Sequence, residues 1–138
     1  MILRKYYITL LTCLIIGSLF TRGQSPILEV TTYSDIVTDS DNTVNATDVV
    51  VFTIKAKNIS NLALSSLTIS HTLKGINGTA LTLNSSPTFF SNSSGSSAGT
   101  LAAGETGTYI ATYTFNGAGV SAGGVSLTVT GTASTPGN

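Results

Sequence analysis

The chain has 138 residues, of which 9% are charged, and its formal net charge is zero. Its single cysteine, Cys13, excludes an intramolecular disulfide and a zinc site built from several thiolates. No arginine follows Arg22, and the six acidic residues beyond it outnumber the three lysines. This balance excludes the basic face that a nucleic-acid-binding protein requires.

The amino terminus has the three parts of a secretory signal peptide. Arg4 and Lys5 form a positive region, and a mostly apolar, uncharged run follows from 8 to 20. This run is shorter than the roughly 20 residues that a transmembrane helix needs. We expect cleavage between Gly23 and Gln24, which predicts a secreted or cell-surface protein with no stable membrane insertion after the signal is removed.

The remaining part, 24–138, has 115 residues, a net charge of −3 and no cysteine. It is long enough for one domain that buries a core without crosslinks. The predicted organisation is a helical signal peptide at 1–23, an N-terminal strand with an Asp-rich loop at 24–47, the main body at 48–132 and a polar tail at 133–138.

The first half of this part shows strand periodicity and no clear helical period. A short edge strand is expected from 27 to 33, followed by a polar loop. The clearest strand covers 48–57, and a further strand covers 67–73. Alternation predicts that these two strands turn the following side chains to one face each: Val50, Phe52, Ile54 and Ala56; then Leu67, Ile69, His71 and Leu73.

The second half continues the pattern. A short strand is expected at 79–83, a long loop at 84–97 held to the body by Phe89 and Phe90, and a Gly-rich connection at 117–124. Two more strands have inward faces formed by Tyr109, Ala111, Tyr113 and Phe115, and by Val125, Leu127 and Val129. About seven short strands of this kind predict an all-β, immunoglobulin-like sandwich, with a closed barrel as the alternative.

Four segments resemble the bacterial "conserved repeat" surface domain. They are Asp48–Asn61, which ends in Asn-Ile-Ser-Asn; Leu67–Leu73; Leu101–Phe115, which opens Leu-Ala-Ala-Gly-Glu-Thr; and Gly119–Val125. The resemblance implies an immunoglobulin-like module, usually repeated in tandem in surface or adhesin-like proteins. It departs from the usual pattern at His71, Ala103 and Leu127, where Asp, Pro and Asn are common.

The Asp-rich loop is the candidate metal site. Oxygen ligands from Asp39, Asp41 and Asp48 could converge on calcium. The loop lacks the sharp-turn Gly of an EF-hand, and Val50 stands where that motif has a bidentate Glu. Asp and Asn also serve ordinary turns, so a solvated loop without any cofactor is the other interpretation.

The pattern contains no arrangement typical of an enzyme. His71 lies on a strand face among aliphatic residues, which favours a packed or rim position, and no Gly-x-Ser-x-Gly motif is present. Glu105 follows a turn, which indicates a structural use.

These observations predict a non-catalytic surface module with a structural, spacer or adhesive role. Its partners would be other surface domains or an extracellular glycan or protein. The alternative is a glycan- or ligand-binding module, with or without the assistance of calcium, that uses Tyr33, Phe89, Phe90 and the Asp-rich loop.

Overall fold

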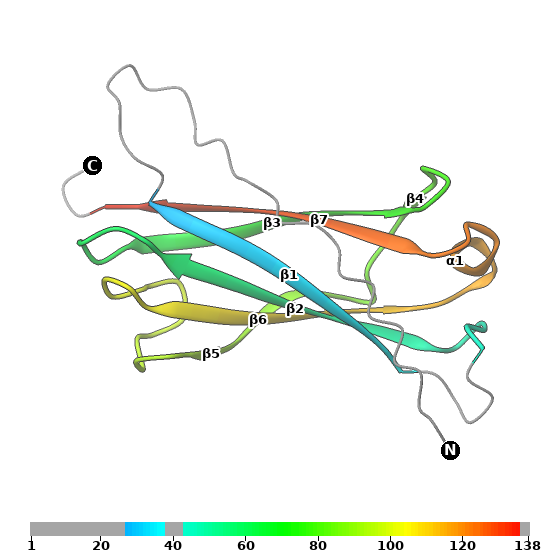
Figure 1. Ribbon diagram of the computed structural model, residues 1–138, viewed down its shortest axis with the longest axis horizontal. Helices are drawn as coiled ribbons and strands as arrows, with labels where there is room; N and C mark the ends of the chain where they lie inside the picture. The colour runs from blue at the N-terminus through cyan, green and yellow to red at the C-terminus, as the bar shows by residue number, and fades with distance from the viewer. Residues whose placement is uncertain (1–26, 38–42, 136–138) are drawn as a thin grey trace.

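The computed structural model describes residues 27–37 and 43–135, which form two packed layers of strands (Figure 1). One sheet has the strand order β1-β2-β6-β5 and the other has the order β4-β3-β7, with antiparallel pairing throughout. The prediction of an all-β sandwich of about seven strands is therefore confirmed. The elements are β1 (Leu28–Val37), β2 (Val49–Asn58), β3 (Ser65–Gly75), β4 (Ala80–Leu81), β5 (Ser85–Asn92), β6 (Thr106–Thr114), α1 (Gly117–Ser121) and β7 (Val125–Ser134).

The core lies between the sheets and is built on β2 and β6. Phe52 pairs with Ala111, and Ile54 pairs with Tyr109, and all four side chains are buried. The predicted inward faces of these two strands are therefore confirmed. Each large apolar side chain removed from water in this way contributes roughly 1.5–3 kcal/mol, which is the main favourable term in folding.

The segment 84–97, expected to be a long loop, instead contains β5, which pairs with β6. The ladder shifts register between Ser85 and Thr88 and again between Phe89 and Ser91. Each shift breaks the two-residue alternation by which a strand is recognised in a sequence. Pro87 lies within the first shift, at the edge of the sheet where proline is tolerated.

Three other boundaries differ from expectation. β1 continues past Tyr33 to Val37, because its pairing with β2 extends to the end of the strand. β7 reaches Ser134, two residues into the expected polar tail. The Gly-rich connection contains α1, capped by Asn116, whose side chain accepts the Gly119 N–H. No helix among residues 27–37 and 43–135 is long and apolar enough to cross a membrane.

The chain runs from one end of the sandwich to the other an even number of times. β4 is antiparallel to β3, and β5 is antiparallel to β6. As a result, β4 and β5 run in the same direction, as one pass that changes sheets. The chain therefore enters at Leu28 and leaves at Ser134 at the same end of the sandwich, at the left in Figure 1. α1 lies at the opposite end, called here the far end.

The far end is closed by a close backbone contact. The Tyr113 hydroxyl donates to the Asn116 side chain at 3.1 Å, which places the ring over α1. A Cβ atom added at Gly119 would overlap this hydroxyl, while one added at Gly117 would meet open space. Gly119 is therefore required by the approach of the Tyr113 ring.

Candidate functional site

Of the three predicted calcium ligands, Asp39 and Asp41 lie outside the described residues. Asp48 is buried, and its carboxylate accepts the Asn45 N–H at 2.8 Å. Its backbone carbonyl accepts the Phe115 N–H at 2.8 Å, so the residue closes the turn before β2. In the described part of the chain, no group of three or more His, Cys, Asp or Glu side chains could hold a metal ion. The calcium site stays a prediction.

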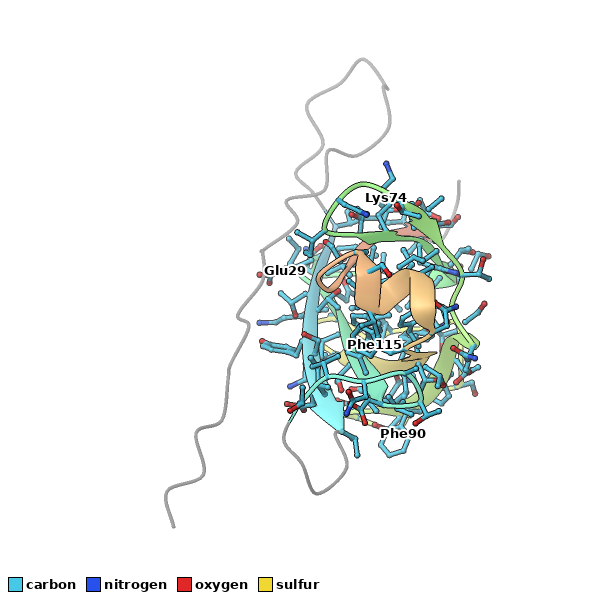
Figure 2. The ribbon with its side chains drawn as sticks, turned by 90° about the vertical axis from the view of Figure 1, so that its right-hand side faces the viewer. Glu29, Lys74, Phe90 and Phe115 are labelled. Atoms are coloured by element: carbon cyan, nitrogen blue, oxygen red, sulfur yellow. The ribbon has the colours of Figure 1, made fainter. Side chains whose placement is uncertain are left out.

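Phe89 and Phe90, the predicted ligand-binding residues, lie in different surroundings, and their binding role stays a prediction. Phe89 packs edge-on against Tyr109, with ring centroids 5.8 Å apart. Phe90 is 70% exposed, and Figure 2 shows its ring standing away from the body, whereas Phe115 lies between the sheets. The expectation that both rings hold this segment to the body is therefore wrong for Phe90. The register shift between Phe89 and Ser91 places Phe90 at an irregular point of the ladder.

The structure describes His71 and does not describe the predicted cleavage site. Gly23 and Gln24, the predicted cleavage site, lie outside the described residues. His71 is exposed on β3, so of the two predicted environments it has the rim position. It lines a hollow of about 240 Å³ together with Leu73, Leu81 and Leu83.

A buried polar network lies at the end where the chain enters and leaves. Asn58 is 0% exposed, and its Nδ2 donates to the carbonyl oxygens of Leu62, Leu101 and Ala102 at 2.7, 3.2 and 2.9 Å. Its Oδ1 accepts the Ser60 N–H at 2.9 Å. One amide thus ties the turn after β2 to the segment that precedes β6.

Glu105 completes this network, and we call the two residues with their backbone partners the polar clamp. Its carboxylate accepts the N–H groups of Ser94, Ser96 and Ala102 at 3.0, 3.1 and 2.7 Å. Its own carbonyl accepts the Asn58 N–H at 2.8 Å. Hydrogen bonding by Ser96, assisted by the other two N–H donors, outweighs desolvation and lowers the pKa of Glu105 to about 2.

The polar clamp joins two of the segments that carry the sequence resemblance. The end of 48–61 supplies Asn58, and the start of 101–115 supplies Glu105. The sequence indicated the structural use of Glu105. It did not indicate that Asn58 is buried, because Asn in a turn is usually exposed and its carbonyl partners at Leu101 and Ala102 are distant in the chain.

A second polar cluster lies on the outer side of the four-stranded sheet. It lines a hollow of about 210 Å³, and we call it the lysine face: Glu29, Thr31, Tyr33, Lys55, Lys57 and Thr106. The Lys55 Nζ lies 5.5 Å from the centroid of the Tyr33 ring, within the range of a cation–π contact. Tyr33 itself is 56% exposed.

The sequence pointed to part of this cluster. Tyr33 was a predicted ligand-binding residue, and Lys55 and Lys57 alternate in the sequence with the predicted inward residues Ile54 and Ala56. The register of β1 on β2 brings these groups together by pairing Glu29 with Lys57 and Thr31 with Lys55. That register depends on strand pairing, which the alternation within a single strand does not specify.

The fold places the chain among antiparallel β-sandwiches. Comparison of the chain with models of known protein families, with curated proteins and with solved structures gives no match. The functional assignment therefore rests on the residues themselves and on their geometry.

Proposed function

We propose that this chain is an exported β-sandwich module of the cell surface, with a structural or adhesive role and no catalysis. The observation that carries the proposal is the shared end of entry and exit at Leu28 and Ser134 (Figure 1). A module attached at one end projects its far end and its outer faces into the surroundings. The predicted export signal at 1–23 supports the location.

The same observation bears on the spacer role. Modules that space other parts in a line receive the chain at one end and release it at the other. Here the chain reverses through β7 and returns to the end at which β1 begins. Display of a surface is therefore favoured over in-line spacing.

The polar clamp supports a non-catalytic role. Glu105 is the most buried acidic side chain of the described residues, at 1% exposed. Its carboxylate is held ionised by three backbone donors, and its pKa is lowered to about 2. A general acid or base works best with a pKa near the operating pH, so this group is suited to structure rather than to proton transfer.

Export and display can be tested in a bacterial host. The full chain and a chain lacking 1–23 would each carry an epitope at the carboxyl terminus. We expect the full chain to be labelled by antibody on intact cells or recovered from the medium, with Gln24 as its first residue. The shortened chain should stay in the cytoplasm, and a full chain confined there would contradict the proposal.

The second candidate function is ligand binding. The contact of Lys55 with the exposed Tyr33 ring favours it, because both groups border one hollow. A calcium-assisted form would use Asp39, Asp41 and Asp48. Titration calorimetry with calcium tests this form, and the absence of both heat and a shift in melting temperature would contradict it.

A further inference from the structure

We propose that the lysine face binds an anionic polysaccharide. Lys55 and Lys57 contact its acidic groups, and the exposed part of the Tyr33 ring packs against a sugar ring. This inference rests on the ligand-binding role and names the class of ligand.

The positive charge of the domain is concentrated on the lysine face. The segment 24–138 has three lysines, no arginine and a net charge of −3. Two of the three lysines project from the same side of β2, two residues apart and therefore about 7 Å apart along the strand. Lys55 and Lys57 thus gather most of the positive charge of an acidic domain on one surface.

The ammonium groups of Lys55 and Lys57 have no acidic partner in the part of the chain that the structure describes and can pair with the acidic groups of a ligand. Glu29 lies opposite Lys57 in the strand register, yet among the described residues neither lysine forms a salt bridge. Lys55 lies against the Tyr33 ring instead, which restricts its position without neutralising its charge. A surface with two cations and one carboxylate retains an excess positive charge.

The shape of the lysine face selects the kind of anion. Its hollow of about 210 Å³ is smaller than the roughly 300–1,000 Å³ of an enclosed ligand pocket. Thr106 and Thr108 lie beside Lys57 and Lys55 on β6 and continue the outer face with hydroxyl groups. An open polar surface of this kind suits a polymer that lies across the strands, with only a ring or an acidic group in the hollow.

The test uses the protein after signal removal, with polygalacturonate, dextran sulfate and neutral dextran as probes. Binding would be measured by titration at low and at physiological salt. The double variant Lys55→Gln/Lys57→Gln removes both cations, and Tyr33→Ala removes the ring. Lys74→Gln is the matched control, because it removes the remaining lysine from β3 in the other sheet.

We expect binding to an anionic probe that falls at least about tenfold in the double variant and about threefold in Tyr33→Ala, while Lys74→Gln matches the parent. Binding of polygalacturonate would identify carboxylate as the acidic group, and binding of dextran sulfate alone would identify sulfate. No binding to either anionic probe, equal binding to neutral dextran, or an equal loss in Lys74→Gln would overturn the inference. Surface labelling is independent of these titrations, so failure of export and failure of binding can be distinguished.

Discussion

The polar clamp and the lysine face are built from similar groups and use them in opposite ways. In the polar clamp, Asn58 and Glu105 are buried, and their amide and carboxylate groups are hydrogen-bonded within the chain. In the lysine face, Lys55 and Lys57 project from an outer surface and form no ion pair with the described residues. Fully paired buried groups fix a fold, whereas exposed groups without partners are open to other molecules.

The difference follows from where each cluster lies in the sandwich. The polar clamp occupies a chain reversal, where backbone groups have left the sheet and still need partners. The lysine face occupies the outer surface of the paired strands near the same end, where the ladder satisfies the backbone groups and the side chains project outward. The clamp should therefore determine stability and the face should determine binding.

Truncation of Asn58 should have the largest effect on stability. Asn58→Ala removes the amide donor from the carbonyls of Leu62, Leu101 and Ala102, each of which keeps one other donor, and it leaves the Ser60 N–H without its acceptor. We expect the free energy of unfolding to fall by about 3 kcal/mol, because several hydrogen bonds of one buried amide are lost together and the Ser60 N–H retains its desolvation cost. Urea denaturation followed by circular dichroism measures this change.

The matched control is Asn77→Ala, in an exposed turn where the side chain accepts one bond, from the Thr79 N–H at 3.0 Å. It should lower the free energy of unfolding by about 0.5 kcal/mol. Equal losses in the two variants would show that the polar clamp has no special role.

The stability of the parent should depend on Glu105 below neutral pH. The pKa of Glu105 is about 2 in the folded protein, against 4.5 for the ordinary carboxyl group. The unfolded chain therefore binds the proton first, so stability is complete above about pH 5 and falls as the pH approaches 2. We expect this group to account for about 2 kcal/mol, since nearby solvent screens part of the pKa difference.

Glu105→Gln separates this contribution from that of other carboxyl groups. The variant should be less stable than the parent at neutral pH, and the gap should narrow as both are taken to acid. Denaturation series at several pH values measure the gap. A gap of constant size would mean that Glu105 titrates alike in the folded and unfolded states.

The sequence predicted the parts of the molecule that depend on local alternation. The inward faces of β2 and β6 were predicted because apolar residues alternate without interruption from Val50 to Ala56 and from Tyr109 to Phe115. β5 was missed because two register shifts interrupt its pattern. The polar clamp and the lysine face depend on partners from separate strands, so only their individual residue types were visible in the sequence.

The far end tests whether packing can stabilise a chain reversal without a buried charge. Gly119→Ala places a methyl group against the Tyr113 hydroxyl and should lower the free energy of unfolding by about 1.5 kcal/mol, as overpacking usually does. Gly117→Ala, in the same helix, meets open space and should change it by less than about 0.5 kcal/mol. Thermal and urea denaturation compare them. Equal behaviour would argue against a close Tyr113 contact.

The smallest effect on stability is expected at the lysine face. Lys55→Gln/Lys57→Gln removes one cation–π contact at an exposed site and should change the free energy of unfolding by about 0.5 kcal/mol. The core packing of β2 is unchanged in this variant, because both lysines project from the outer face of the sheet. A loss as large as that of Asn58→Ala would give the face a structural role and remove the contrast with the polar clamp. Near-parental stability with lost polysaccharide binding would instead give the polar clamp its role in the fold and the lysine face its role in binding, because an ammonium group without an ion-pair partner in the fold contributes chiefly when a ligand supplies one.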